Sequence, residues 1–211
     1  MHQTNFGKRN WTVLFLFGLI GQIAWSVENM YFNLFVFETI APNLEAVTLM
    51  VQLSGIVATL TTLIAGTFSD KLGNRRMFIC LGYLIWGLSI GAFGFLSTEN
   101  VQALLDVDAV RAVGIALAAV VVGDCIMTLF GSTANDAAFN AWVTDNTHAA
   151  YRGKVEGVLA ILPLVAMLIV AGGFGILVSI IGYKWLFLGL GAIITLCGAI
   201  GLFFIKDRNT L

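Results

Sequence analysis

Charged side chains are scarce in this sequence of 211 residues: 11% are Asp, Glu, Lys or Arg, whereas 59% are hydrophobic. A soluble globular domain carries roughly a quarter charged residues, so the shortage excludes an ordinary soluble domain. The formal net charge is only −1, and no basic tail or patch is present, which argues against nucleic acid as a partner. The composition predicts an integral membrane protein whose main partner is the lipid bilayer.

Cysteine is sparse as well, and no pattern typical of an active site occurs. Cys80, Cys125 and Cys197 all lie inside apolar runs, where cysteine behaves as a small buried hydrophobe. Their spacing matches no metal site. The sequence also lacks a nucleophile–base pairing and a phosphate-binding loop. We therefore expect no enzymatic activity, no cofactor and no metal.

Long apolar segments dominate the chain. A bilayer core about 30 Å thick requires about 20 helical residues. Six segments meet this length, and each is predicted to be a transmembrane helix: residues 11–37, 47–68, 77–96, 114–141, 155–181 and 183–205. They lack the short alternating pattern of an outer-membrane barrel. We expect an all-α integral membrane protein with one domain over residues 1–211.

Lysine and arginine are divided unevenly between the two sides of such a bundle. One side holds nine of them: Lys8, Arg9, Lys71, Arg75, Arg76, Arg152, Lys154, Lys206 and Arg208. The other side holds two, Arg111 and Lys184. Positive residues collect on the cytoplasmic side of membrane proteins. Both termini are therefore predicted to be cytoplasmic, in a plasma membrane or the cytoplasmic (inner) membrane of a bacterium.

The first segment has a polar stripe with steps of four, three and four residues. Its members are Gln22, Ser26, Asn29 and Asn33. Trp25 and Phe32 lie beside this stripe, and Glu28 is about 100° away from it on a regular helix. Hydrogen bonds between helices would account for the stripe. The other interpretation is a cavity wall, because amides, an acid and an aromatic ring together suit a polyhydroxylated ligand.

The fourth segment contains two overlapping polar stripes. One is Ser132, Asp136 and Asn140, and the other is Asp124, Thr128, Ser132 and Asn135. A charge at mid-bilayer costs about 2.5–3.5 kcal/mol, so an acidic residue there is a candidate functional group. Asp136 is predicted to bind substrate or a proton, with a structural pair to Asn140 or to a neighbouring helix as the alternative. Asp124 is a candidate proton carrier, with a buried partner as the alternative.

The second segment has a stripe of small and hydroxylated residues: Thr48, Gln52, Gly55, Thr59, Thr62 and Gly66. Such residues allow helices to approach closely. The stripe fits packing within one bundle, and it equally fits a face that meets a second six-helix unit.

Residues 66–76, GTFSDKLGNRR, join the second and third segments with a compact set of charges and glycines. We expect a tight turn there, in which glycines permit sharp bending and Asp70 can cap a helix N-terminus. Any short cytoplasmic loop collects Lys and Arg, which is the simpler interpretation. The spacing, however, resembles the signature loop between helices 2 and 3 of the major facilitator superfamily. The resemblance implies a half bundle of 3+3 helices and a conformational latch at Gly66, Asp70, Lys71, Gly73, Arg75 and Arg76.

Two further stretches carry a narrower resemblance. Residues 132–154, STANDAAFNAWVTDNTHAAYRGK, resemble the helix 4–5 region of the glycoside–pentoside–hexuronide cation symporters of the melibiose-permease type. Residues 21–38, GQIAWSVENMYFNLFVFE, are similar to the first helix of that family and of sucrose-type carriers. The resemblance implies that Asp136 stands at a sugar-contacting position and Gln22 near another. Two departures limit this resemblance. Residues 47–68 lack Asp and Glu, which argues against sodium coupling of that type, and the antiporter motif of helix 5 is missing, which argues against a drug antiporter.

These patterns lead to a hypothesis about function. The chain is interpreted as half, or an N-terminal fragment, of a major-facilitator secondary transporter that moves a small polar solute, a sugar or glycoside among the candidates, with protons. The expected solute-binding residues are Gln22, Trp25, Asn29, Asn33, Asp136 and Asn140, and the expected ion-coupling residues are Glu28, Asp124 and Asp136. Alternating access requires a second six-helix bundle, from a C-terminal half or a second protomer. The rival is a non-transporting membrane assembly protein whose polar stripes are packing contacts.

Overall fold

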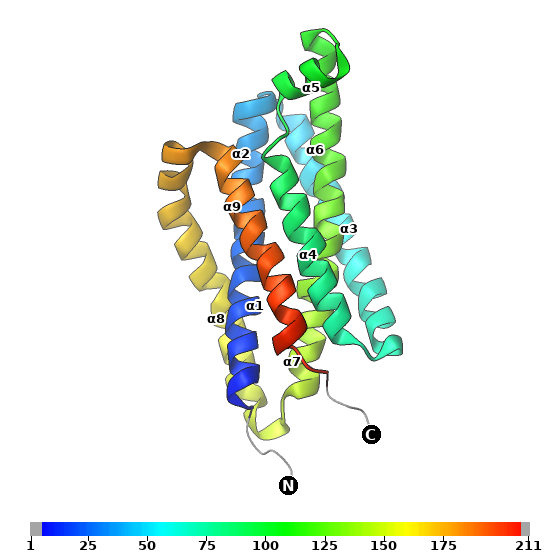
Figure 1. Ribbon diagram of the computed structural model, residues 1–211, viewed down its shortest axis with the longest axis vertical. Helices are drawn as coiled ribbons and strands as arrows, with labels where there is room; N and C mark the ends of the chain where they lie inside the picture. The colour runs from blue at the N-terminus through cyan, green and yellow to red at the C-terminus, as the bar shows by residue number, and fades with distance from the viewer. Residues whose placement is uncertain (1–5, 208–211) are drawn as a thin grey trace.

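The computed structural model describes residues 6–207, and all secondary structure in that range is helical (Figure 1). The first half comprises α1 (Lys8–Val27), η1 (Glu28–Phe32), α2 (Asn33–Phe35), η2 (Val36–Ile40), α3 (Leu44–Leu72), α4 (Arg75–Phe93) and α5 (Thr98–Leu105). The second half comprises α6 (Ala109–Gly131), η3 (Ser132–Phe139), α7 (Asn140–Asn146), η4 (Ala149–Tyr151), α8 (Arg152–Ile169), η5 (Val170–Phe174) and α9 (Gly175–Phe204). Here η4 is a 3₁₀ turn and the other η segments are π-helical.

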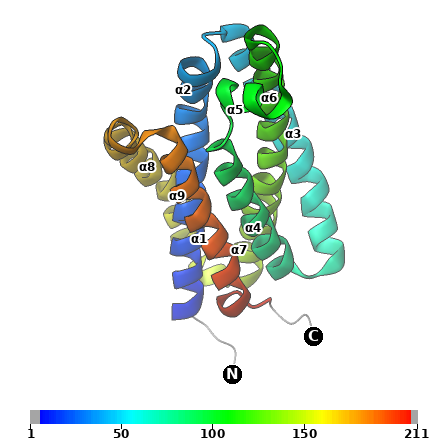
Figure 2. The ribbon, with the colours of Figure 1, turned by 45° about the horizontal axis from the view of Figure 1, so that its top comes forward.

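Within residues 6–207, five helical stretches are long and apolar enough to cross a membrane: Lys8–Ile40, Leu44–Leu72, Arg75–Phe93, Ala109–Asn146 and Ala149–Phe204. The first four each overlap one predicted segment. The fifth, 56 residues long, covers both of the last two predicted segments except residue 205. It is broken at Gly182, whose φ of 75° and ψ of 167° are not helical. Figures 1 and 2 show the chain reversing direction in this orange part.

Polar side chains cap several of these helices. Asn43 accepts a hydrogen bond from the Ala46 N–H at 3.1 Å and so caps α3. Asp108 caps α6 in the same way through the Arg111 N–H at 2.9 Å. The short helix α5, at the top of Figure 1, was not expected from the sequence, which left that region as a connection.

Glycines bring α4 and α9 into backbone contact. A Cβ atom added to Gly87 would lie 2.5 Å from the carbonyl oxygen of Gly191, and one added to Gly191 would lie 2.5 Å from that of Gly87. Real side chains cannot approach so closely. Small residues at facing positions allow this approach, which is a common way for helices to associate in membranes.

Aromatic side chains fill the centre of the bundle, where α1, α4 and η3 meet. Tyr83 and Trp86 of α4 are fully buried, as is Phe17 of α1. The Tyr83 hydroxyl donates a bifurcated hydrogen bond to the Phe17 carbonyl at 2.7 Å and to Asn135 Oδ1 at 3.0 Å. This hydrogen bond satisfies a buried polar group and fixes α1 and η3 relative to α4.

The helices differ widely in how much of their surface the bundle covers. In the most apolar stretch of α4, 44% of residues are buried, against 6% in α3. Because α3 is apolar and yet uncovered, its surface must face lipid or a partner.

Candidate functional site

A cavity of about 380 Å³ lies between α1 with η1, α3, and α6 with η3. Its walls combine amides, acids, hydroxyls and a few apolar groups: Gln22, Trp25, Glu28, Asn29, Asn33, Met50, Val51, Ser54, Gly55, Ala58, Asp124, Thr128 and Asp136. The volume lies within the range of small-molecule sites.

The cavity brings together most of the residues predicted to bind solute. Gln22, Trp25, Asn29, Asn33 and Asp136 all line it, as do the other two predicted ion-coupling residues. Their roles in binding and coupling remain predictions.

Asn140, also predicted to bind solute, does not line this cavity. It lines a smaller one of about 140 Å³, which it shares with Gln22 and Asn135. Its side chain donates to the backbone carbonyl of Asp136 at 3.1 Å and not to the carboxylate. The carboxylate instead accepts a hydrogen bond from the neighbouring Asn135 amide at 3.2 Å.

The amides of the first helix make hydrogen bonds along their own helix. Asn29 Nδ2 donates to the Trp25 carbonyl at 2.8 Å, and Asn33 Nδ2 donates to the Asn29 carbonyl at 3.1 Å. The interhelical hydrogen bonds considered for this stripe are not found for these two side chains among the described residues. Their amide oxygens, which are acceptors, therefore remain available to a ligand.

Two carboxylates in the cavity are incompletely satisfied. Thr128 Oγ1 donates to Glu28 Oε1 at 3.3 Å. The other oxygen, Glu28 Oε2, is buried and has no hydrogen-bond partner in residues 6–207. The same holds for Asp124 Oδ1 in the described chain, although the side chain of Asp124 is only 2% exposed. Such buried orphan acceptors are costly, so they indicate a group that a ligand or proton completes.

Two π-helical segments form part of the cavity wall. η1 contains Glu28 and Asn29, and η3 contains Asn135 and Asp136. In an α-helix, residues spaced four apart from Asp124 to Asp136 would drift by about 120° in total around the axis. The wider turn of η3 reduces this drift, so both carboxylates face the same cavity. Such wide turns occur frequently at functional sites.

Helix α3 contributes a wall that the sequence analysis did not assign to the site. Its residues there are Met50, Val51, Ser54, Gly55 and Ala58. Only Gly55 belongs to the predicted stripe on this helix. The stripe residues Thr48 and Thr59 donate to carbonyls of their own helix, at 2.7 and 2.9 Å, and are exposed. A buried hydroxyl, Ser54, was the available signal for the cavity face.

The predicted turn at residues 66–76 is shorter than expected. Residues 66–72 belong to α3, which ends at Gly73 in the left-handed conformation with φ 61°. Asn74, and not Asp70, caps α4, because Asn74 Oδ1 accepts from the Met77 N–H at 3.2 Å. Lys71 is exposed.

Arg75 is the centre of a charge cluster at this end of the bundle. Its guanidinium pairs with Asp70 and, through Nε at 3.2 Å, with Asp145 of α7. It also donates to the buried Ser69 hydroxyl. The cluster therefore connects the α3–α4 turn to the end of α7.

Arg76 connects the same turn to the end of α9. Its backbone N–H donates to Asp207 Oδ1 at 3.0 Å, and its guanidinium donates to the Leu202 carbonyl. Burial raises the pKa of Asp207, although the hydrogen bond and positive charge of Arg76 oppose this rise. The Trp142 indole donates to the Lys206 carbonyl at 2.9 Å, which fixes this end further.

The fold and cavity define a multi-pass helical membrane protein with a polar site among its helices. The family model of the Major Facilitator Superfamily matches residues 9–211. The chain therefore belongs to the major facilitator superfamily, whose members are transporters and not enzymes. Comparisons with curated proteins and with solved structures gave no match.

Proposed function

We propose that this chain is one six-helix half of a secondary transporter, and that the cavity between α1, α3 and α6 binds a small polar solute. The observation that carries the proposal is the 380 Å³ cavity, whose wall combines amides with buried acids that lack full hydrogen bonding. A purely structural polar seam would satisfy these groups within the protein.

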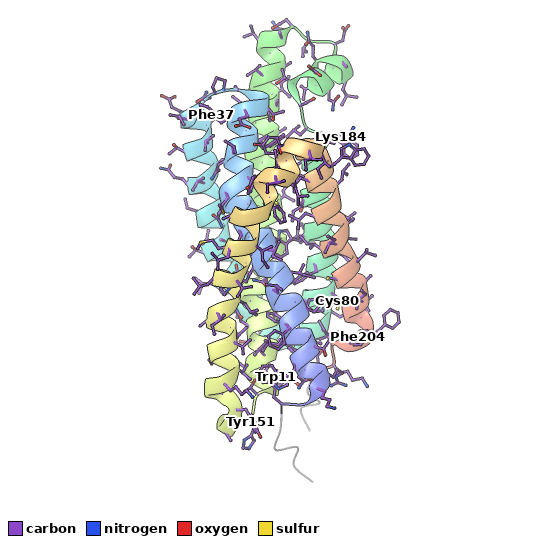
Figure 3. The ribbon with its side chains drawn as sticks, turned by 90° about the vertical axis from the view of Figure 1, so that its left-hand side faces the viewer. Trp11, Phe37, Cys80, Tyr151, Lys184 and Phe204 are labelled. Carbon is purple, nitrogen blue, oxygen red and sulfur yellow. The ribbon has the colours of Figure 1, made fainter. Side chains whose placement is uncertain are left out.

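Six membrane crossings are part of the proposal. The non-helical Gly182 supports a division of the Ala149–Phe204 stretch into two spans. Trp11, Tyr151 and Phe204 lie toward one end of the bundle, and Phe37 and Lys184 toward the other (Figure 3). The first end is the one with most Lys and Arg, so we assign it to the cytoplasm of a plasma or bacterial inner membrane. Arg208, counted in that assignment, lies outside the described residues.

A second six-helix bundle is the expected partner. The uncovered face of α3 supports this, because residues there such as Gln52 and Thr59 are polar and exposed. A carboxy-terminal half or a second protomer would cover this face and close the cavity. Movement of one bundle against the other would then give alternating access. In this arrangement the α3–α4 turn at Gly73, with Asp70 and Arg75 on either side of it, acts as the latch between the bundles.

Protons are the proposed coupling ion, taken up by Glu28, Asp124 and Asp136. Amide groups and the Trp25 ring would bind a hydroxylated solute, which is the basis for a sugar or glycoside of the kind moved by the glycoside–pentoside–hexuronide symporters. The rival assembly-protein interpretation requires these same groups to be packed against protein.

Thiol labelling in proteoliposomes tests the proposal. In a background without the three native cysteines, Ser54→Cys places a thiol in the cavity, and Leu63→Cys places one on the exposed apolar face of the same helix. We expect a charged thiol reagent to label Ser54→Cys from either side of the membrane and Leu63→Cys from neither. Protection of Ser54→Cys from both sides would support the assembly protein instead.

A further inference from the structure

The cavity contains three acidic side chains and no basic one. Glu28, Asp124 and Asp136 line it, and its lining includes neither Lys, Arg nor His. Because the three acids line one cavity, their charges would repel one another if all of them were ionised. Carboxylates inside a membrane normally face a cation or water, because their isolated charge is expensive.

The ion pairs of the described chain do not reach this cavity. Arg75 pairs with Asp70 and Asp145, and Arg111 pairs with Asp108. These ion pairs lie at the ends of helices. Within residues 6–207, no ion pair includes any of the three cavity acids. Compensation of their charge must therefore come from protons or from a bound ligand.

Several groups of the wall are free hydrogen-bond acceptors, and one buried donor, Trp25 Nε1, also has no partner in the described chain. Glu28 Oε2 and the almost fully buried Asp124 Oδ1 have no partner in the described chain. Asn29 and Asn33 each donate one amide N–H to their own helix, which leaves the amide oxygen and the second N–H of each. The two unpartnered carboxylate oxygens are complementary to a ligand with N–H donors and a positive charge.

The spacing of the acids favours an extended organic cation over a metal ion. No group of three His, Cys, Asp or Glu in residues 6–207 is placed to hold a single metal ion. The cavity, at about 380 Å³, is also much larger than one ion requires. The Trp25 ring in the same wall offers a face to an organic cation.

We infer that the solute of this cavity is a small organic cation with ammonium or guanidinium N–H groups, bound in exchange for protons. The inference rests on the transporter and the cavity proposed above, and it replaces the neutral sugar by a cationic solute. Each positive charge that binds displaces one carboxyl proton into solution, so charge is balanced in the loaded and empty cavity. Hydroxyl groups on the solute would be bound by Asn29 and Asn33.

A matched pair of ligands tests the charge requirement. Glucamine (1-amino-1-deoxysorbitol) and sorbitol differ only in an ammonium against a hydroxyl group, and an alkylammonium is charged at pH 7.5. Calorimetric titration of the complete chain in lipid nanodiscs measures the affinity for each of the two ligands. We expect glucamine to bind at least about tenfold more tightly than sorbitol, because a charge-assisted hydrogen bond contributes about 1.5–3 kcal/mol. Titration in buffers of different ionisation enthalpy should show proton release with glucamine alone.

Variants locate the effect in the cavity. Asp124→Asn and Glu28→Gln should each weaken glucamine binding at least about tenfold. Glu99→Gln removes the same charge from the exposed start of α5 and should leave the affinity for glucamine unchanged. Thermal unfolding of each variant checks that it folds, and the second variant keeps the test valid if the first does not.

The outcomes separate this inference from the proposed function. Equal binding of the two ligands, tighter binding of sorbitol, or no binding of either would overturn the cation inference. A transporter of neutral solutes would still stand in these cases if Ser54→Cys is labelled from both sides. If that thiol is protected, the proposed function fails as well.

Discussion

The cavity and the charge cluster around Arg75 both contain carboxylates, but they treat them in opposite ways. At the end of the bundle, Asp70 and Asp145 share one guanidinium, and both are substantially exposed. In the cavity, Asp124 is 2% exposed and has an oxygen without a partner in the described chain. The charge cluster therefore connects helices, whereas the cavity acids have oxygens that can bind a ligand or a proton.

The largest expected effect on stability is the loss of Arg75. Arg75→Ala removes the guanidinium that pairs with Asp70 and Asp145 and that donates to the buried Ser69 hydroxyl. We expect the free energy of unfolding to fall by about 1–3 kcal/mol, measured by denaturant titration in detergent. Arg111→Ala is the matched control, because the Arg111–Asp108 pair is largely exposed, and it should cost about 0.5 kcal/mol or less. If Arg75→Ala and Arg111→Ala lower the free energy of unfolding by similar amounts, the cluster around Arg75 is no more stabilising than an exposed ion pair.

A substitution in the cavity should raise the free energy of unfolding, whereas Arg75→Ala lowers it. Asp124→Asn replaces a buried, incompletely paired carboxylate by a neutral amide of similar size. We expect the free energy of unfolding at pH 8 to rise by about 1 kcal/mol, because folding no longer requires this carboxyl either to take up a proton or to lose its hydration. Thermal unfolding without ligand measures this. A loss of stability would mean that Asp124 has a structural role like that of the acids beside Arg75.

The cap of α4 gives a smaller and more local effect. Asn74→Ala removes the acceptor for the Met77 N–H, and the loss of such a cap costs about 1 kcal/mol. Asp70→Ala, at a 63% exposed side chain, should cost less, because it loses only a surface ion pair. Denaturant titration of both variants compares them. A larger loss of stability in Asp70→Ala than in Asn74→Ala would indicate that Asp70, and not Asn74, caps α4.

The smallest effect is a pH dependence at Asp207. Burial raises the pKa of Asp207 in the folded protein, so the folded state binds the proton more tightly than the unfolded state. Its stabilising contribution is present below the ordinary pKa and is lost as the pH rises through the raised value. The difference in melting temperature between the natural protein and Asp207→Asn should therefore shift against the natural protein as the pH increases. A constant difference would contradict this.

Composition and helical periodicity predict the membrane-length helices and much of the cavity. Hydrophobic length marks the spans, and polar residues three or four apart mark the wall from Gln22 to Asn33. The π-helical turns were missed because a wider turn leaves no mark in the residue types. Asp136 and Asn140, four residues apart, line different cavities, which their spacing alone did not indicate.

Local contacts were predicted less well than periodicity. Asp70 and Asn74 are both good capping residues, and the end of α3 at Gly73 decides between them. Ser54 was overlooked because a single serine among apolar residues resembles ordinary packing. The wall contributed by α3 depends on how α3 meets α6, which is a tertiary contact that no local pattern encodes.

The wide turns of η3 lie between Asp124 in the cavity and Asp145 beside Arg75. Were η3 to tighten by one residue, everything after it would rotate by about 100° relative to everything before it. The helix would remain unbroken, yet Asp145 would swing away from its guanidinium. The conformation of η3 therefore couples the orientation of the cavity residues to that of the charge cluster at the end of the bundle.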